Sequence, residues 1–396
     1  MLLATSRART LCRTRQRMTL LSIPKIANEK YPALTGVRAV GATVVFFDHF
    51  PLAADDYVTV NVMAFFFTLS GFLIVRIYYE RLELTGQWLK QYFVNRFARI
   101  YPVYFLLLSV AVCIQHDFRP WILFTNYTLT HALFHHAEMI IQPSWSLTVE
   151  ECFYLLAPLF MVLARRFNFF AAFALGCMLF AAALAISTTG SAFLGTKGFV
   201  LSTTFFGHFV EFFAGIYLAL ALVKLERKQS IALPGCRFTI IGLMGVSAMV
   251  IAMIIVYAHR PLNTLAVIWL NNFLIPVPIA VLYWGLLRER TPLSRFLSNK
   301  VIGLLGRASY SFYLLHTIII DDLSIPMLPI LGHRPLVVIL TLVVTWLVSI
   351  ALFVCYEEPL NKSIRRRFGQ HLATQPTMRP GRAIGSTSVD CSRRRL

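Results

Sequence analysis

Ten long apolar stretches constrain this chain more than any other feature of its sequence. A helix of about 20 residues crosses the hydrocarbon core of a bilayer, and each stretch comes close to that length or can be extended to it. They lie near residues 34–53, 58–79, 101–115, 145–164, 168–187, 200–223, 239–258, 264–287, 301–323 and 335–356. The sequence therefore predicts an all-α fold, a polytopic integral membrane helix bundle with about ten transmembrane helices.

The overall composition leads to the same class of protein. Of the 396 residues, 57% are apolar and only 14% are charged, whereas a soluble protein carries roughly 25% charged residues. This small number of charged residues could not cover the surface of a water-soluble protein of this size. Part of the surface must therefore face the lipid bilayer. The third stretch is short, and we expect it to gain length from Arg99 or from residues beyond Gln115. Segment 119–141 carries Asn126 and several ionisable residues, which predicts an external loop with a re-entrant or interfacial piece.

The distribution of charge indicates how the chain is oriented. The net charge is +19, from 37 Lys and Arg against 18 Asp and Glu. With the amino terminus inside, all but four basic residues fall on the cytoplasmic side, which is the bias of inner-membrane proteins. The four exceptions are Arg119, Lys197, Arg260 and Arg334. The sequence thus predicts a multi-pass protein of the cell (inner) membrane with both termini cytoplasmic. The basic charge serves topology and contact with anionic lipid, and no nucleic-acid partner is expected because no basic-aromatic binding motif is present.

The chain divides into three parts by composition. Residues 1–33 form a basic cytoplasmic segment, residues 34–362 the transmembrane domain, and residues 363–396 a basic tail that is predicted to be disordered. No cysteine pair has the C-x-x-C spacing of a zinc site or redox motif. His131 and His135 have the i, i+4 spacing that suits a metal, with His136 and Glu138 nearby. A wet interfacial cluster is the preferred interpretation, and no metal site is predicted.

Ionisable side chains within the apolar stretches are the best indicators of function, because each costs several kcal/mol in hydrocarbon. Arg38 and His49 lie eleven positions apart on the first stretch. At about 100° per residue they differ by only about 20°, so they share a helix face roughly 16 Å apart along the axis. The simpler alternative is interfacial anchoring, in which Arg38 snorkels to the cytoplasmic surface and His49 sits near the outer one.

Two arginines precede the third stretch. Arg96 and Arg99 have i, i+3 spacing and so share one face at the cytoplasmic surface. Pro102 suits the first turn of the following helix. The pair is explained either by ordinary positive-inside anchoring or by an anion site, since paired guanidinium groups bind phosphate well.

Two further stretches carry unusual polar residues. Glu150 and Glu151 lie more than a turn inside the fourth stretch, after the interfacial Trp145. Adjacent carboxylates at that depth are hard to explain as anchors, and a structural ion pair is the alternative. The ninth stretch contains the polar run from Ser309 to His316, and the tenth ends in Glu358-Pro359.

Together these segments resemble the membrane acyltransferase family 3, which contains O-acetylases of surface polysaccharides. The resemblance covers about residues 34–362, which would then be the transmembrane acyltransferase domain. The matching pieces are the Arg38–His49 pair, Phe66 through Ile74, Arg96 through Pro102, Trp145 through Tyr154, Ser309 through His316, and Glu358-Pro359. Many members carry a Gly-Val-Asp run before the Ser-Gly segment, where this chain has Val60-Asn61-Val62-Met63. That departure bears on the choice of substrate.

The resemblance implies an enzyme that uses cytoplasmic acyl-CoA as co-substrate, with acetyl-CoA the expected donor and no bound cofactor. The acceptor would be a hydroxyl of a cell-surface glycan or glycolipid, such as a polysaccharide or lipopolysaccharide. The family treats the residues matching Arg38 and His49 as essential and the paired arginines as functional. The resulting catalytic candidates are His49, Arg38, Glu150 and His316, and the candidates for binding acyl-CoA are Arg96, Arg99 and Arg38.

Depth in the bilayer divides these candidates into two tiers. The arginines lie toward the cytoplasmic face, and His49, Glu150 and His316 lie toward the outer one. His49 could remove the acceptor's proton as a general base or take the acyl group as a covalent carrier, and both roles stay open. A transporter or flippase of a polysaccharide export system is the alternative function. A non-catalytic membrane subunit is disfavoured by the retained charged residues.

Overall fold

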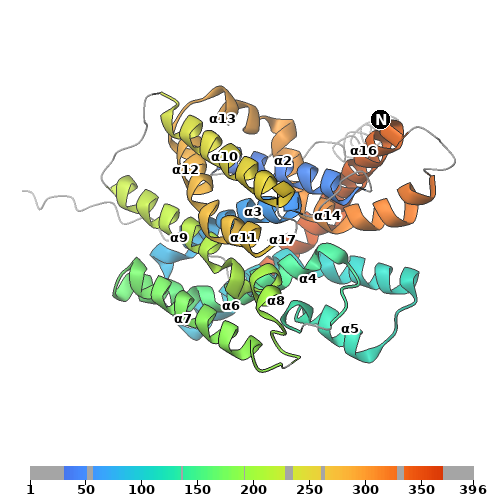
Figure 1. Cartoon of the computed structure of the whole chain (residues 1–396), viewed down its shortest axis with the longest axis horizontal. Coiled ribbons are helices and arrows are strands. Elements are labelled where there is room, and N and C mark those ends of the chain that lie inside the picture. Colours follow the sequence, from blue (N-terminus) through green and yellow to red (C-terminus); the bar gives the residue numbers. More distant parts are fainter. Residues whose placement is uncertain are drawn as a thin grey trace, which may run out of the picture.

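The computed structural model describes residues 31–50, 57–134, 137–190, 192–227, 235–259, 264–327 and 334–368, and their regular structure is helical (Figure 1). The α-helices are α2 (Pro32–His49), α3 (Tyr57–Tyr78), α4 (Gly86–Gln115), α5 (Pro120–Tyr127), α6 (Trp145–Arg166), α7 (Phe169–Ser187), α8 (Lys197–Thr203), α9 (Phe205–Arg227), α10 (Arg237–His259), α11 (Thr264–Trp269), α12 (Pro276–Arg288), α13 (Pro292–Leu297), α14 (Lys300–Ile319), α16 (Arg334–Leu352) and α17 (Glu358–Phe368). Three π-helical segments are η5 (Leu270–Leu274), η6 (Ile320–Ser324) and η7 (Phe353–Glu357). Three short 3-10 turns complete the set: η2 (Tyr79–Arg81), η3 (His131–Leu133) and η4 (Gln142–Ser144).

Eight helical segments of the described residues are long and apolar enough to cross a membrane, and they confirm a multi-pass membrane protein. They are Val62–Arg81, Gly86–Gln115, Gln142–Arg166, Phe169–Ser187, Lys197–Arg227, Arg237–Val256, Ala266–Arg288 and Pro335–Phe368. The other two predicted stretches are also helices, α2 with 18 residues and α14 with 20. Both fall short in apolar character because they carry the ionisable candidates Arg38, His49 and His316. A cytoplasmic location of both termini stays a prediction.

The structure corrects one prediction in the third stretch. Helix α4 runs for 30 residues from Gly86, where the Thr85 hydroxyl accepts a hydrogen bond from the Trp88 N–H at 3.1 Å. Arg96 and Arg99 therefore lie within the helix, which supplies the missing length. Pro102 lies inside α4, so its predicted place in a first turn is wrong. A proline in a helix interior leaves one carbonyl unbonded, a loss that membrane helices tolerate when their neighbours pack closely.

Segment 119–141 was not predicted to be a span, and its described residues form the eight-residue α5 and short turns, with the Asn126 side chain bonded to both Ile122 O and Glu138 O. Two other segments differ in detail from their predictions. The eighth stretch divides into α11, η5 and α12. Residues 363–368, which were predicted to begin a disordered tail, continue α17 as a helix. The rest of that tail and residues 1–30 lie outside the described residues.

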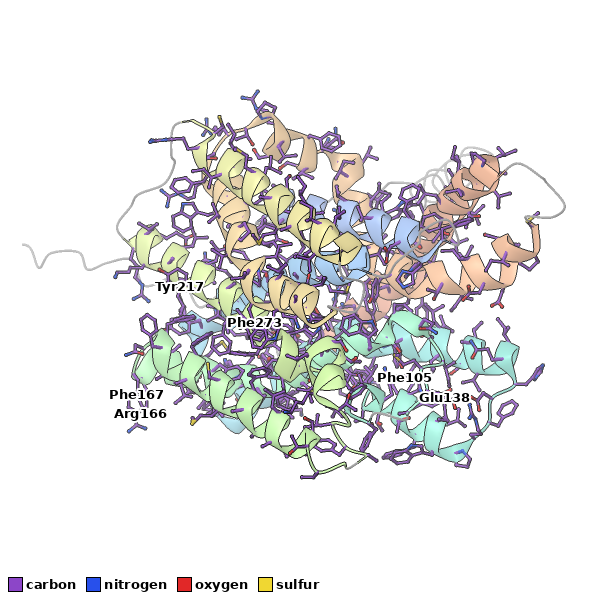
Figure 2. All side chains as sticks on the ribbon, in the orientation of Figure 1. Phe105, Glu138, Arg166, Phe167, Tyr217 and Phe273 are labelled. Carbon is purple, nitrogen blue, oxygen red and sulfur yellow. The ribbon has the colours of Figure 1, made fainter. Side chains whose placement is uncertain are left out.

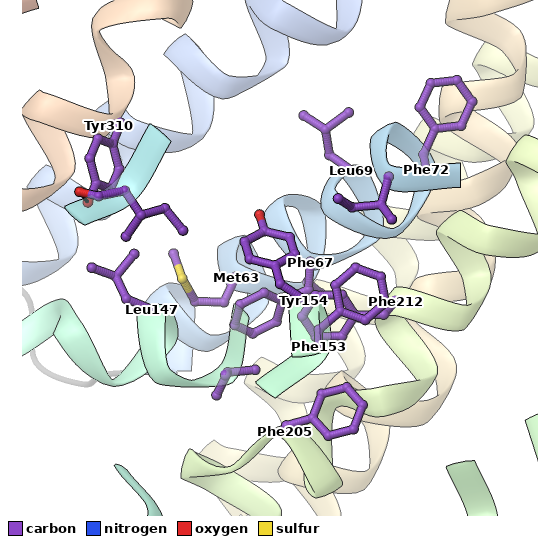
Figure 3. Packing of buried hydrophobic residues seen from close by; sticks show 14 of the residues in the cluster. Met63, Phe67, Leu69, Phe72, Leu147, Phe153, Tyr154, Phe205, Phe212 and Tyr310 are labelled. Carbon is purple, nitrogen blue, oxygen red and sulfur yellow. Dashed lines mark hydrogen bonds between the residues drawn. The ribbon is translucent and has the colours of Figure 1, made fainter. Parts of the chain in front are cut away.

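Helices α3 and α9 form the centre of the bundle. About two thirds of their membrane windows are buried, at 61% and 67%, against 17% for α7 and α10. Rings from α3, α9 and α6 stack in this core, with centroids 5.0 Å apart for Phe67–Phe212 and 4.3 Å for Phe153–Phe212 (Figure 3). At the periphery, apolar side chains such as Phe167 and Tyr217 project outward (Figure 2). Exposed apolar side chains on α7 and α10 are the surface that lipid would cover.

Glycines let the central helices approach one another with their backbones. A Cβ atom on Gly71 of α3 would overlap the carbonyl of Phe212 on α9, and one on Gly215 would overlap the carbonyl of Thr68. Gly71 is therefore a point of close backbone contact between α3 and α9. Gly306 of α14 lies in the same way against the carbonyl of Thr35 on α2. Hydrocarbon provides no hydrophobic force between membrane helices, so close contacts of this kind hold such a bundle together.

Replacing Gly306 by alanine should destabilise the protein, because the added Cβ cannot fit against the Thr35 carbonyl without separating α2 from α14. Overpacking of this kind typically costs about 1–3 kcal/mol. Gly303→Ala, one turn earlier on the same helix, is the matched control, since a Cβ there meets only the flexible end of Arg307 at 3.9 Å. Thermal unfolding in detergent measures both variants. Equal melting temperatures for the two would show that the α2–α14 crossing does not depend on Gly306.

Candidate active site

The two candidate histidines meet at neighbouring helix ends. Helices α2 and α14 pack along one another, and His49 is the last residue of α2 while His316 lies near the end of α14. Their ring centroids are 5.0 Å apart with the ring planes at 81°. The structure thus places together two residues that the sequence assigned to one depth. His316 is fully buried, and its ring is stacked parallel to that of Phe312 at 6.2 Å.

Hydrogen bonds to the backbone indicate which ring nitrogen of each histidine carries the proton. His49 Nδ1 lies 3.0 Å from the carbonyl of Val45, and His316 Nδ1 lies 2.6 Å from that of Tyr313. A carbonyl can only accept, so Nδ1 donates in each neutral imidazole and Nε2 keeps its lone pair. His316 Nε2 has no hydrogen-bond partner among the described residues. Each ring therefore presents an unprotonated nitrogen that is able to accept a proton.

Asp321 is a residue near this pair that sequence reasoning missed. It lies in the π-helical segment η6, directly after α14, close enough to His49 for an electrostatic interaction. The signal in the sequence was the pair Asp321-Asp322 at the end of an apolar stretch.

A small cavity occupies the space between α2, α3, α6 and α14. Its volume is about 60 Å³, and its polar lining comes from Arg38, Glu150, Ser146, Ser309 and the tyrosines 310 and 313. This volume holds a few water molecules at most. Because the Tyr313 ring lies 5.7 Å from that of His316, the cavity extends from the arginine level toward the histidines.

The structure shows which neighbours the Glu150 side chain faces. Its carboxylate accepts a hydrogen bond from the hydroxyl of Ser70 and faces the cavity that Arg38 also lines. The sequence assigned Glu150 to the depth of His49, but depth along a helix does not determine which neighbour its side chain faces. Ser70 lies next to the close α3–α9 crossing, and its hydroxyl directs the carboxylate toward α3. Glu150 is therefore a partner of Ser70 in a cavity shared with Arg38.

The paired arginines of α4 have different surroundings. The Arg96 guanidinium lies over the rings of Tyr78 and Tyr154, 5.6 and 5.5 Å from their centroids. It forms no salt bridge within the part of the chain that the structure describes. Arg99 instead pairs with the carboxylate of Glu357 and lies 5.6 Å from the ring centroid of Tyr310. Among the described residues, Arg96 thus has no carboxylate at salt-bridge distance, although Glu151 is near enough to act on its charge, whereas Arg99 pairs directly with Glu357.

Glu357 is the second residue that sequence reasoning missed. Its side chain is only 1% exposed, one oxygen pairs with Arg99, and the other accepts a hydrogen bond from the Ser311 hydroxyl at 2.6 Å. The resemblance pointed instead to Glu358, which forms an exposed pair with Lys362 at 2.8 Å. The adjacent glutamates were visible in the sequence, but the π-helical segment η7 decides which of them faces inward. π-helical turns of this kind are frequent at functional sites.

The polar run of α14 connects the surrounding elements. The Tyr310 hydroxyl donates to the carbonyl of Ile100 on α4 at 2.8 Å, and Ser311 bonds Glu357 at the end of η7. The Tyr313 hydroxyl lies 2.9 Å from the carbonyl of Pro143 and 2.8 Å from the hydroxyl of Ser146 at the start of α6. This run therefore fixes α14 against four other elements around the cavity: α4, η7, η4 and α6.

Of the three histidines in segment 119–141, His131 is described by the structure, and it takes part in a hydrogen bond within the fold. His131 Nε2 is hydrogen-bonded to the Ser144 hydroxyl at 3.1 Å, and burial lowers the pKa of His131 to about 4, so it is neutral near pH 7. Glu138 pairs with Arg119. His135 and His136 lie outside the described residues.

Glu357→Gln should lower the thermal stability of the protein, because it leaves Arg99 without its buried counter-charge. Breaking a buried ion pair costs about 3–5 kcal/mol, and we expect the lower part of that range because the Arg99 side chain is 25% exposed. Glu358→Gln is the control on the adjacent residue and should cost about 0–1 kcal/mol, as exposed pairs do. Calorimetry of the purified variants compares them. A larger loss for Glu358→Gln would contradict the inward placement of Glu357.

Comparisons with known proteins show what this chain is similar to. The model of a family described as an acyltransferase domain matches residues 31–354. Peptidoglycan O-acetyltransferase OatA of Listeria monocytogenes is 29% identical over 157 residues, covering 34% of this chain and 25% of that protein. An uncharacterized protein of Haemophilus influenzae is 30% identical over 122 residues, covering 26% of this chain and 50% of its own length. The chain thus spans half or less of the length of these relatives. No solved structure matches significantly.

Proposed function

This chain belongs to the acyltransferase family whose domain spans residues 31–354, and from that we propose that it moves an acyl group, expected to be acetyl, from acyl-CoA to a hydroxyl of a cell-surface glycan or glycolipid. The observation that carries the proposal is the arrangement around α14. Arginines lie at one level of the bundle, two histidines with available Nε2 atoms lie at another, and a polar cavity lies between them. A transporter or flippase would not account for membership of an acyltransferase family.

The arginine level would hold the donor. CoA carries a diphosphate and a 3′-phosphate, and guanidinium groups form strong charge-assisted hydrogen bonds to such anions. Arg96 is available for this because its charge is held by tyrosine rings rather than by a carboxylate. Arg38 lines the cavity toward which the pantetheine arm would have to extend. Since the cavity holds only about 60 Å³, binding of the arm requires the surrounding helices to separate.

The histidine level would carry out the transfer. As general base, His49 Nε2 takes the proton of the acceptor hydroxyl while the hydroxyl oxygen attacks the thioester carbonyl carbon. The C–S bond then breaks, and the departing CoA thiolate receives the proton from the imidazolium. As covalent carrier, His49 would first take the acyl group on Nε2 and release CoA before the hydroxyl attacks. The adjacent ring of His316, 5.0 Å away, would orient His49 in either route.

The nature of the acceptor rests on the relatives. The Listeria relative is named for O-acetylation of peptidoglycan, a surface glycan, but this chain covers only 25% of it. A glycan or glycolipid hydroxyl is the acceptor class that this similarity supports. Comparing the masses of surface glycans from cells with and without the gene would identify both the acyl group and the acceptor.

His49→Ala should abolish acyl transfer while leaving folding and CoA binding intact, because it removes the nitrogen that accepts the hydroxyl proton. Loss of a general base typically lowers the rate by about 10²–10⁴. His49→Gln keeps part of the hydrogen bonding but cannot cycle a proton, so it should fail as well. The measurement is acyl transfer by the purified protein, with thermal stability determined alongside. His316→Ala should cause a smaller defect, and wild-type transfer by a folded His49→Ala variant would refute the assignment.

Arg96→Ala together with Arg99→Ala should weaken binding of acyl-CoA, since a phosphate site loses charge-assisted hydrogen bonds worth about 1.5–3 kcal/mol each. Of the two single variants, we expect Arg96→Ala to have the larger effect on affinity, because Arg99 already pairs with Glu357. Titration of the purified variants with acetyl-CoA measures this. An unchanged dissociation constant in the folded double variant would remove both residues from the donor site.

A further inference from the structure

A groove of about 590 Å³ lies between α7, α9, α10 and α12, and it shares no lining residue with the cavity of the candidate active site. Every residue that lines it is apolar or aromatic. Tyr217 and Val277 in this lining are 58% and 61% exposed, so the groove opens at the periphery of the bundle, where Figure 2 labels Tyr217. All four walls belong to segments that are long and apolar enough to cross a membrane. The groove therefore opens toward lipid.

The walls of the groove are two closely packed helix pairs. Helix α7 packs on α9, where a Cβ on Gly176 would lie 2.8 Å from the ring of Phe209. Helix α10 packs on α12, where a Cβ on Gly242 would lie 2.5 Å from the Cα of Leu282. Closing the groove would therefore require one pair to move as a unit against the other.

The side chains of the lining leave room for a slender apolar molecule. Three of them are alanines, at 214, 221 and 280, and they lie among large rings such as Phe173 and Trp284. The hydrocarbon core of a bilayer holds no water to fill such a space, and a wall without neighbouring atoms loses its dispersion contacts. The unbranched acyl chain of a lipid has the shape and the polarity that this space requires.

Basic side chains border one end of the groove. Lys224 lies three positions after Ala221 and seven after Tyr217, so it continues the face of α9 that lines the groove. Arg237 directly precedes Phe238, the lining residue in the first turn of α10. Both basic side chains are exposed, and neither forms a salt bridge within the described ranges.

The carboxylates near this end are largely occupied. Glu289 is buried, and its two oxygens accept hydrogen bonds of 2.9, 2.9 and 2.7 Å from the first turn of α10, although it is also near enough to act on the charge of Arg237. Glu226 pairs with Arg76 at 2.7 Å. The exposed charge where the groove ends is therefore that of Lys224 and Arg237, which suits an anionic headgroup.

The basic end of the groove lies far from the histidines. Arg288 follows Trp284 by one turn, with its guanidinium carbon 5.3 Å from the centroid of that ring. Arg288 also borders a second cavity together with Pro32, the first residue of α2. His49 is at the other end of α2, about 25 Å along the axis. A molecule with its head at the basic end is thus not an acceptor positioned at His49.

We propose that this groove binds an anionic phospholipid, with one acyl chain between α9 and α12 and the headgroup phosphate on Lys224 and Arg237. The chain lies against Ala280 and Trp284, and it fills the space between the two helix pairs. The lipid is a structural ligand that holds these pairs together. This inference does not rest on the proposed function, because the groove is separate from the candidate active site.

The test uses the full-length protein in nanodiscs of phosphatidylcholine that contain a small fraction of lipid with brominated acyl chains. Bromine quenches tryptophan fluorescence on contact, so a brominated chain in the groove quenches Trp284. The protein has six tryptophans, and the contribution of Trp284 is the difference between the wild type and Trp284→Phe. Separate titrations with brominated phosphatidylglycerol and brominated phosphatidylcholine measure the preference for the anionic lipid.

The wild type should prefer phosphatidylglycerol by about 25-fold, because each basic residue beside an anionic lipid contributes about fivefold. Lys224→Gln and Arg237→Gln should each lower this preference about fivefold. Lys300→Gln is the matched control, since Lys300 is an exposed basic residue at the start of α14 and does not line the groove. It should keep the full preference.

A second pair of variants tests the place of the acyl chain. Ala280→Phe puts a ring into the groove and should abolish quenching of Trp284 by either lipid. Met244→Phe adds a ring on α10 at a position that is 67% exposed and outside the lining, and it should leave the quenching unchanged. Thermal unfolding shows whether each variant is folded, and if Ala280→Phe is not, the charge variants still decide the inference.

Three outcomes would overturn the inference. If brominated phosphatidylcholine quenched Trp284 as strongly as brominated phosphatidylglycerol, the groove would be ordinary lipid-facing surface without a headgroup site. If a folded Ala280→Phe variant kept the quenching of Trp284, the chain would lie elsewhere. If neither lipid quenched Trp284 and the protein in the nanodisc were a dimer, a second copy of the chain would cover the groove instead.

Discussion

The contact of Gly306 with the backbone of Thr35 is the constraint on which the candidate site depends. It lets α14 lie directly against α2, so that residues at corresponding heights on the two helices meet. Toward one end, Arg38 and Ser309 line the same cavity, and toward the other the rings of His49 and His316 are in contact. A larger side chain at position 306 would separate both pairs at once. The site is thus a property of a helix crossing rather than of a loop, which gives it the rigidity that positioning of reacting groups requires.

Burying polar residues at this crossing carries a cost that other contacts offset. Helices α2 and α14 are the two predicted spans that lack the apolar character of the other eight. In hydrocarbon an unsatisfied polar group costs several kcal/mol, so these helices have to be covered by their neighbours. The hydroxyls of Tyr310, Ser311 and Tyr313 each find an acceptor on another element, which satisfies them and also fixes α14 in place. The polar run therefore contributes to packing as well as to lining the cavity.

Helix periodicity and depth in the bilayer predicted much of the candidate site from the sequence, but they could not predict which neighbour each side chain faces. The ten stretches and the shared depth of His49 and His316 follow from apolar runs and from residue spacing. The partner of Glu150 could not be predicted, because Ser70 lies 80 residues away and no local pattern connects the two.

π-helical turns are the other source of failure. An extra residue in a turn shifts every following side chain around the helix, and the sequence gives no sign of where that shift occurs. Glu357, at the end of η7, faces Arg99 and Ser311, while the adjacent Glu358 pairs with Lys362 at the surface. Spacing alone could not choose between them. Pro102 is another position that the sequence could not place, because a proline usually marks the start of a helix, whereas α4 continues through it.

The small size of the cavity has a consequence for how such an enzyme would work. An acyl thioester carried across a bundle is exposed to hydrolysis wherever water can follow it, and a closed path keeps water out. In the state described here, the space between the arginines and the histidines is about 60 Å³ and is bordered by the rings of Tyr310 and Tyr313, whose hydroxyls are bonded to α4 and to Pro143. Opening the path requires the hydrogen bonds of the Tyr310 and Tyr313 hydroxyls to break.

Binding of the CoA phosphates at the arginine level would supply the free energy for this opening, although it acts far from the reacting carbonyl. Arg99 connects the two, because its partner Glu357 also holds Ser311, next to Tyr310 on α14. A phosphate that draws Arg99 away from Glu357 would therefore weaken the contact between Glu357 and Ser311, which holds α14 in the closed arrangement. The cavity would then open to the thioester only when CoA is bound.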